Sequence, residues 1–421
     1  MSDHPSPPEQ FYLGRQPILD REQRLVAYEL LFRSSQDNAA SFACGTHATA
    51  TVIANAFSEL SVADSLGDCL GFINVDEDFL FSDLLELLPR ENIVLEILET
   101  VPPTPEVVQR CHALKAAGFR LALDDVTTIT PAHRDLLLLA DIIKVDLLQL
   151  GETALNYLVE QLKPLGKQLL AEKVDTIEQH DRCLALGFSL FQGYYFAKPT
   201  IIAGKKMNHS QLSLMTLMGL LMSDADTAEL ENAFKPEPAL TVSLLRMTNS
   251  AGAGTTVRIT SLRHAITILG RRQLQRWLQL LLFAANGKDA LANPLLQLAA
   301  TRGRLMESLA RQVREGDTGF ADQAFMVGIM SLMPALVGLP MEEVVTPLAV
   351  APEVKDALCA GEGTLGNLLR LTVAAELGEP AEIGPFLNIF TTITPSTLNH
   401  CLTEALAWAN SLNRERQDDG T

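Results

Sequence analysis

Acidic side chains stand at the ends of several apolar runs in the first half of this sequence, and such groups can do chemistry. The run LALDDVTTIT (121–130) ends its apolar part in two adjacent acids, Asp124 and Asp125. If the runs are parallel strands of a β/α barrel, their carboxyl ends meet on the face where such folds build active sites. Other apolar runs end in, or contain, further polar groups: Glu29, Asn74, Glu96, Lys144, Asp146, Glu172 and Gln192.

Several carboxylates on one rim repel one another unless cations lie among them. Oxygen ligands favour hard divalent ions such as Mg²⁺, Mn²⁺ or Ca²⁺. Two such ions can polarise a phosphate, activate water and stabilise both in-line oxygens of phosphodiester hydrolysis. Lys144 could hold the attacking water, and Arg33 could clamp a phosphate. In the alternative, structural interpretation, Glu29 and Arg33 form a rim ion pair, the aspartates cap helices, and the barrel is a scaffold.

Eight apolar runs are the candidate strands that would position these side chains. They are rich in Val, Ile, Leu and Phe, as strands buried on both faces are. Eight strands with helical crossovers predict a closed TIM-like (β/α)8 barrel. An open doubly wound sheet is the alternative, but no G-x-G-x-x-G turn is present. The runs comprise residues 11–19, 24–32, 69–75, 93–98, 119–125, 140–146, 167–172 and 188–196.

The clearest helix candidate between these runs is TPEVVQRCHALKAAG. Thr104 can cap it, Pro105 suits its first turn, and Gly118 ends it. From Met207 to about Arg414 the patterning is mostly helical, which predicts an all-α second domain. We therefore expect a barrel domain over 11–200, a helical domain over 201–414, and flexible tails at 1–10 and 415–421.

Composition limits the function classes. A net charge of −18 disfavours nucleic-acid binding, which relies on basic surface. Six cysteines without a C-x-x-C pair predict reduced thiols in a cytoplasm. The start MSDHPSPPEQ does not have the pattern of a signal peptide, and no uninterrupted apolar run has the length of a membrane span. We expect a cytoplasmic protein without nucleic-acid or membrane partners.

Eight short motifs, in order, resemble those of the EAL domain, the bacterial cyclic di-GMP phosphodiesterase fold. The resemblance covers roughly residues 11–200. It rests on RQPI, ELLFR, INV, LEILE, DDV, IKVD, AEKVD and FQGYYFAKP. The later stretches FKPEPALTVSLLRMTNSAG and ITSLRHAITILGRRQLQRWL resemble the HDOD domain, over roughly residues 207–410. The combination is similar to two-domain EAL–HDOD signalling proteins of the YuxH type.

The resemblance implies a role for each matching residue. Lys144 matches the catalytic lysine, Glu172 matches an acid near the nucleophilic water, and Asp125 matches a second-metal ligand. Gln16, Arg33 and Gln192 match groups on the substrate side, and Glu99 matches the anchor of the loop after the paired aspartates. Mg²⁺ or Mn²⁺ is the implied cofactor of a working site. The implied metal ligands are Glu29, Asn74, Glu96, Asp124 and Asp125.

The surroundings of these residues depart from the family pattern. The family's glycine-bearing F-G-T/S-G turn is Val126-Thr127-Thr128-Ile129 here, so a turn that needs positive φ would be strained. Lys173 and Asp175 replace Gly and Glu of a second loop. MSLM (330–333) stands where a metal-dependent HD enzyme has His-Asp, so we expect the HDOD domain to bind a protein partner.

These departures favour a degenerate EAL domain that acts as a regulator or nucleotide sensor. An active metal-dependent cyclic di-GMP phosphodiesterase and an interaction scaffold without nucleotide are the alternatives. Homodimerisation stays open. The basic stretch 271–276 could contact phosphate or an acidic partner, or form a solvated helix face.

Overall fold

The computed structural model describes residues 11–34, 66–67, 69–193, 209–223, 225–249, 261–284, 294–348, 350–378 and 380–417. The chain divides into two compact units. One unit contains Met1–Lys198 together with Arg370–Thr421, and the other contains Pro199–Leu369. The domain boundaries expected from the sequence stay a prediction, and the expected N-terminal tail lies outside the described residues.

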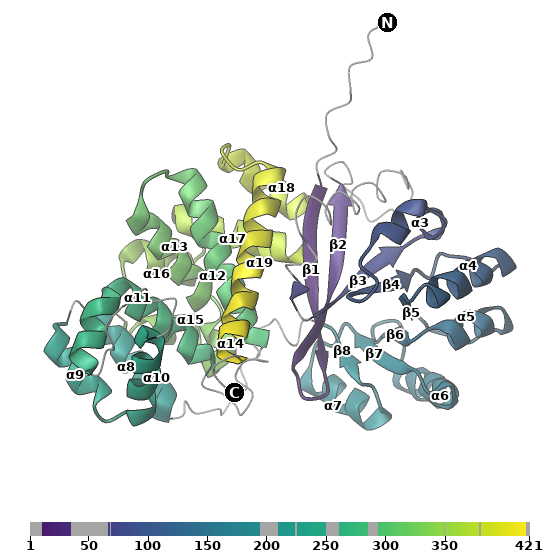
Figure 1. Ribbon diagram of the computed structural model, residues 1–421, viewed down its shortest axis with the longest axis horizontal. Coiled ribbons are helices and arrows are strands. Elements are labelled where there is room, and N and C mark those ends of the chain that lie inside the picture. Colours follow the sequence, from purple (N-terminus) through teal and green to yellow (C-terminus); the bar gives the residue numbers. More distant parts are fainter. Residues whose placement is uncertain are drawn as a thin grey trace, which may run out of the picture. The chain divides into compact units, whose positions relative to one another are not determined.

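The first unit contains the closed eight-stranded barrel that the sequence predicts, with strands in sequential order (Figure 1). Every predicted strand is present at its predicted place. The strands are β1 (Phe11–Asp20), β2 (Leu25–Ser34), β3 (Leu70–Val75), β4 (Ile93–Ile97), β5 (Arg120–Leu123), β6 (Ile142–Asp146), β7 (Gln168–Glu172) and β8 (Leu190–Phe191).

Strand β1 corrects the expectation of an all-parallel barrel. It pairs antiparallel with both β2 and β8, while β2 to β8 pair in parallel. The connection from Asp20 to Leu25 is too short for a helical crossover, so β1 and β2 form a hairpin. The Asp20 carboxylate closes this turn by accepting hydrogen bonds from the backbone N–H groups of Glu22 and Arg24. Gln16 therefore lies in mid-strand, opposite Glu29.

The helix predicted after residue 104 is α4 (Pro105–Ala116). Its N-cap is Thr104, whose side chain accepts a hydrogen bond from Val107 N, and Gly118 follows it with φ 99°. The helices α3 to α7 lie on the outside of the barrel, as Figure 1 shows. Their bounds are α3 (Glu77–Leu80), α5 (Arg134–Leu139), α6 (Glu152–Leu162) and α7 (Ile177–Leu186), with short 3₁₀ turns η1 (Asp83–Leu87), η2 (Pro131–His133) and η3 (Lys163–Leu165).

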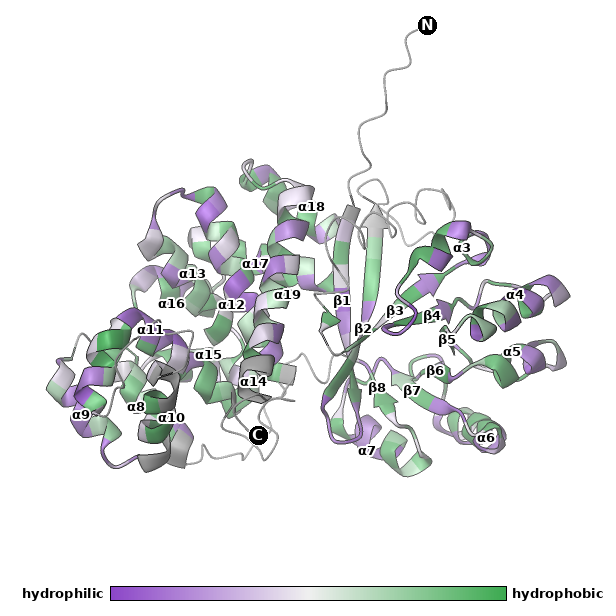
Figure 2. Ribbon diagram, viewed as in Figure 1, coloured by the Kyte–Doolittle hydropathy of each residue, from purple (hydrophilic) through white to green (hydrophobic). Residues whose placement is uncertain are grey.

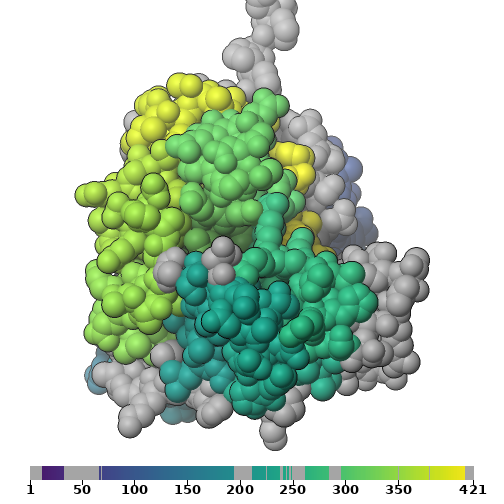
Figure 3. Space-filling model, turned by 90° about the vertical axis from the view of Figure 1, so that its left-hand side faces the viewer, coloured from purple at the N-terminus to yellow at the C-terminus, as the bar shows by residue number. Residues whose placement is uncertain are grey.

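The second unit is helical throughout its described residues, and Figure 2 shows apolar and polar residues alternating along many of its helices. In the side view of Figure 3, teal and green helices form the surface of this unit. Its helices are α8 (His209–Met222), α9 (Thr227–Phe234), α10 (Pro238–Asn249), α11 (Leu262–Ala284), α12 (Pro294–Val313), α13 (Thr318–Met330), α14 (Met333–Val337), α15 (Met341–Val345) and α16 (Pro352–Cys359), and α17 (Gly363–Leu377) continues into the other unit.

Two features of these helices bear on the sequence predictions. Gly270, with φ 72°, kinks α11 within the stretch that resembles the HDOD domain. Thr318–Val337 is long and apolar enough to cross a membrane, but most of it is buried among the other residues of the chain. Burial explains its composition, since a core helix is apolar on all sides.

The last described helices, α18 (Pro380–Ile389) and α19 (Pro395–Gln417), belong to the same unit as the barrel. The Asn399 side chain on α19 accepts a hydrogen bond from Leu13 N of β1, at 3.2 Å. Helix α19 runs three residues into the expected flexible tail 415–417, because Glu415, Arg416 and Gln417 have good helix propensity. Residues 418–421 lie outside the described residues.

Candidate active site at the barrel mouth

Alternation along the strands brings most of the predicted site residues together. One layer of apolar side chains fills the inside of the barrel: Ile18, Ala27, Phe72, Val94, Ala122, Ile142, Leu170 and Leu190. Side chains two residues apart on a strand point to the same face. On the antiparallel strand β1, Gln16 lies two positions before Ile18. On each of the other seven strands, a polar residue lies two positions after the apolar one. Together these polar residues form the next layer: Glu29, Asn74, Glu96, Asp124, Lys144, Glu172 and Gln192.

Lys144 lies at the centre of this polar layer and is 1% exposed. Its ammonium nitrogen lies 2.9 Å from Glu172 Oε1, 3.2 Å from Asp124 Oδ1 and 3.5 Å from Glu29 Oε2. It also forms a hydrogen-bonded ion pair with Glu96 Oε1. One cation therefore faces four carboxyl groups, so the site has more acid groups than its lysine can balance.

Burial of so many like charges shifts their pKa values. Burial, the largest cause, raises the pKa of Glu96 well above its usual value, and the Lys144 ammonium opposes this only in part. Burial likewise raises the pKa of Glu172 to about 8, again against the effect of Lys144. Burial alone would lower the pKa of Lys144, but the surrounding carboxylates raise it well above its usual value. Lys144 and both acids therefore hold their protons more firmly than usual.

Amide side chains orient the Glu29 carboxylate from two sides. Gln192 Nε2 donates to Glu29 Oε2 at 2.6 Å and to Gln16 Oε1 at 2.7 Å. Asn74 Nδ2 donates to Glu29 Oε1 at 3.4 Å. The structure thus joins Gln16 and Gln192 to the acid cluster, as predicted. Arg33 lies on β2 opposite Tyr12, and its side chain lies outside the described residues.

Five buried oxygens in this layer accept no hydrogen bond from the described residues, although one of them, Asp124 Oδ1, forms the ion pair with Lys144. An unpaired buried acceptor is costly and indicates a missing partner. These are amide and carboxylate oxygens, which are the ligands that Mg²⁺ and Mn²⁺ prefer. The set therefore fits a divalent cation. The oxygens are Asn74 Oδ1, Glu96 Oε2, Asp124 Oδ1, Glu172 Oε2 and Gln192 Oε1.

In the loop after the paired aspartates, the residue with a positive φ is Asp125 and not a residue of the glycine-free turn. Among the described residues, Val126 to Ile129 avoid positive φ, and Asp125 itself adopts φ 45°. Val126 N donates to Lys144 O, and both Val126 and Ile129 pack against the core. The prediction of strain in the glycine-free turn Val126–Ile129 is therefore wrong. The loop lines a cavity of about 310 Å³ whose polar end contains Glu99, Asp124 and Asp125. One carboxylate oxygen from each of these acids lies within 4.8 Å of the others.

Three residues outside the predicted set complete the barrel mouth. The Asp146 carboxylate forms an ion pair with Lys173 and accepts hydrogen bonds from Leu148 N at 2.7 Å and Gln149 Nε2 at 3.2 Å. Gln149 Nε2 also donates to Asp125 Oδ2 at 3.0 Å. Sequence reasoning notices Asp146 as a strand-end acid and Lys173 as a departure from the family pattern. It assigns no role to Gln149, because this residue lies in the loop after β6, where no strand or helix pattern predicts the direction of a side chain.

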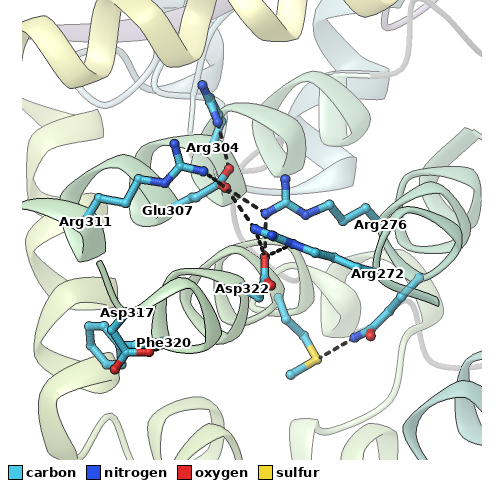
Figure 4. Close-up of polar contacts among 10 residues, drawn as sticks. Arg272, Arg276, Arg304, Glu307, Arg311, Asp317, Phe320 and Asp322 are labelled. Carbon is cyan, nitrogen blue, oxygen red and sulfur yellow. Dashed lines mark hydrogen bonds and ion pairs between the residues drawn. The ribbon is translucent and has the colours of Figure 1, made fainter. Parts of the chain in front are cut away.

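The basic stretch 271–276 is part of a structural network in the helical unit. Arg271 donates to the backbone oxygens of Leu221 and Ala225. Arg272 and Arg276 form ion pairs with Asp322, and Arg276 also pairs with the buried Glu307 (Figure 4). The sequence left open a phosphate or acidic partner and a solvated helix face. Arg272 and Arg276 are paired with acids of this same unit, and Arg271 with its backbone oxygens.

Comparison with known proteins agrees with this architecture. The chain matches the EAL domain family over residues 9–199 and the HDOD domain family over residues 209–344. It is 29% identical over 411 residues to the YuxH protein of Bacillus subtilis, covering 95% of this chain and 98% of that protein. It is 32% identical over 364 residues to the cyclic di-GMP phosphodiesterase CdgJ of Vibrio cholerae, covering 86% of this chain and 83% of that protein.

A solved structure is similar over the barrel. The EAL-domain protein YkuI of Bacillus subtilis, in complex with its substrate c-di-GMP and calcium, is 23% identical with a TM-score of 0.39. The match covers 45% of this chain and 54% of that one, so it spans about half of each protein.

Proposed function

Because this chain belongs to the family of proteins that join an EAL domain to an HDOD domain, we propose that it is a cytoplasmic cyclic di-GMP signalling protein. Its barrel binds the dinucleotide together with Mg²⁺ or Mn²⁺ and acts as a sensor or regulator. Its HDOD domain transmits the signal by contacting a protein partner. The observation that carries this proposal is the buried acid layer around Lys144, in which five oxygens accept no hydrogen bond from the described residues.

The proposed ligand is a phosphodiester, and the chain's own residues suit it. A divalent ion held by Asn74, Glu96 and Asp124 would supply positive charge for the phosphate oxygens. Gln192 donates to Gln16 Oε1 and thereby orients the Gln16 amide, whose N–H groups can donate hydrogen bonds to a bound ligand. Lys144 keeps its proton, so it adds a fixed positive charge at the bottom of the site.

Hydrolysis of cyclic di-GMP is the second candidate function. It is favoured by the retention of Lys144 and Glu172, which contact each other at 2.9 Å. Glu172, with a pKa of about 8, could exchange a proton with water near neutral pH. The rewritten loops argue for slow turnover, since displacement of a reacting group by about 1 Å can reduce a rate about a hundredfold.

Calorimetric titration of cyclic di-GMP into the full chain, with Mg²⁺ or Mn²⁺, tests both candidates. The Glu96→Gln variant removes the charge of the most buried acid and should weaken binding at least about tenfold. The matched control is Glu106→Gln, in the first turn of α4 on the outside of the barrel. Chromatography of the same samples detects cleaved product.

The outcomes separate the candidates. Binding without product establishes a receptor, and binding with product that Glu96→Gln abolishes establishes a phosphodiesterase. Absence of heat with either metal overturns the proposal and leaves the barrel as an interaction scaffold.

A further inference from the structure

The acids at the barrel mouth fall into two groups that differ in how their oxygens are paired. In the inner group, the unpaired oxygens belong to Glu96, Asp124 and Glu172, together with neighbouring amides. In the outer pair, Asp125 and Asp146, neither carboxylate has a buried oxygen without a hydrogen bond. Among the described residues, the inner group therefore has more buried acceptor oxygens than Lys144 and the neighbouring amides supply hydrogen bonds for.

Asp146 is saturated by the chain itself. It is 1% exposed, and three donors approach its carboxylate: Leu148 N at Oδ1, and Gln149 Nε2 and Lys173 Nζ at Oδ2. Burial alone would raise the pKa of Asp146, but the hydrogen bonds from Lys173 and Leu148 outweigh it and lower the pKa. Asp146 is therefore a buried carboxylate already matched with a cation.

Asp125 is tied to the same arrangement. Gln149 Nε2 donates to Asp125 Oδ2 at 3.0 Å and to Asp146 Oδ2 at 3.2 Å, so one amide bridges the two acids. Burial and the Asp124 carboxylate raise the pKa of Asp125, and the Lys173 ammonium, bound to Asp146 at the other side of the bridge, opposes this with positive charge. Any second divalent ion that used Asp125 would approach this ammonium.

Lys173 holds this position against its backbone preference. Its φ is 55°, in the left-handed region that favours glycine. It directly follows Glu172 at the end of β7. Such a conformation persists where the surroundings enforce it, and strained residues gather at functional sites. The ion pair between the Lys173 ammonium and Asp146 can offset the cost of this backbone conformation.

We propose that Lys173 is a built-in cation that takes the place of a second divalent ion, so that the barrel mouth binds one divalent cation per chain. This inference rests on the proposed function, since it assumes that the inner acids bind a metal. A single ion can hold a phosphodiester, but it cannot clamp both the attacking and the leaving oxygen as a two-metal site does. Lys173 is thus a specificity-determining residue that biases the barrel toward binding over hydrolysis.

The test is the number of Mn²⁺ ions bound per full-length chain, measured by calorimetry and by electron paramagnetic resonance. The unmodified protein should bind one Mn²⁺ and give the spectrum of an isolated ion. Lys173→Gly, which removes both the charge and the backbone strain, should bind two. Two ions about 3.5–4 Å apart give an exchange-coupled spectrum, which does not depend on catalysis.

Further variants separate charge from backbone. Lys173→Met removes the charge while keeping a side chain at φ 55°, so this variant should also bind a second ion. The second ion should bind at least about tenfold more tightly than at any weak second site of the unmodified protein. Lys173→Arg should still bind one. Lys163→Met, which removes an exposed lysine paired with exposed Glu160, is the control for loss of one charge.

Each outcome has one meaning. Two tightly bound ions in the unmodified protein, or one ion in both Lys173→Gly and Lys173→Met, overturn the role of Lys173 and leave the proposed function standing. No bound ion in any of these proteins overturns the metal-dependent function itself, and this inference with it.

Discussion

At the scale of single residues, one buried carboxylate organises the charged centre of the helical unit. Glu307 on α12 is 0% exposed, and its oxygens accept hydrogen bonds from Arg276, Arg304 and Arg311 (Figure 4). Burial alone would raise the pKa of Glu307, but the hydrogen bonds and charges of Arg276 and Arg304 outweigh it and lower the pKa. The arginines would repel one another without this acid.

Glu307→Gln should lower the free energy of unfolding by about 3 kcal/mol at pH 7, because it leaves the arginines without their buried counter-charge. Since the folded-state pKa is lowered, this stabilisation is present above the unfolded pKa of about 4.3 and is lost as the pH falls through the folded-state pKa. Urea unfolding at pH 7 and pH 3 measures the difference, which should shrink at pH 3. Glu160→Gln, at an exposed pair, should change stability little at either pH.

The same residue scale shows what the sequence can predict of the site. Glu29, Glu96, Lys144 and Glu172 were predicted to meet because they lie at the ends of apolar runs, and the carboxyl ends of barrel strands converge on one face. The pairing of Lys173 with Asp146, and the bridge that Gln149 makes, depend on loop backbone angles. The pattern of apolar runs does not encode those angles, so these contacts needed the structure.

At the scale of elements, glycines set the distance between α12 and α13. A Cβ atom on Gly328 would lie 2.7 Å from Arg302 O and 2.7 Å from Gly303 Cα. These are backbone atoms, which cannot rotate away as a side chain can. The two helices therefore cross with their backbones nearly touching, and the arginine network around Glu307 lies along the same pair of helices.

Gly328→Ala should destabilise the protein by about 1–3 kcal/mol, because the added methyl group forces α12 and α13 apart. Gly319→Ala, on the same helix α13, is the matched control, since its nearest neighbour would be Asp317 Oδ1 at 3.6 Å. It should be neutral or stabilise by up to about 1 kcal/mol through helix propensity. Equal effects of the two changes in thermal or urea unfolding would contradict close packing at Gly328.

At the scale of the whole chain, the barrel unit is discontinuous in sequence, because Arg370–Thr421 joins Met1–Lys198. Eight apolar runs with helical segments between them predicted the barrel, and helical patterning predicted the later helices, but neither pattern tells which unit a C-terminal helix packs against. The reason for the packing is local to β1. Among the described residues, β1 pairs with β8 only at Leu19 and Asp20, so the N–H of Leu13 needs another acceptor, which Asn399 supplies.

A substitution at Gly14 on β1 tests whether the C-terminal segment Arg370–Thr421 stabilises the barrel unit. A Cβ atom at Gly14 would lie 2.5 Å from Gly378 Cα, a backbone contact within the unit. Gly14→Ala should therefore displace the segment from β1 and, by overpacking, destabilise the unit by about 1–3 kcal/mol. Hydrogen exchange should show α19 losing at least about tenfold of its protection, because its packing supports its helical hydrogen bonds. Gly151→Ala, where an added Cβ has open space, should leave α19 protected. Unchanged protection of α19 in Gly14→Ala would mean that β1 is held without the C-terminal helices.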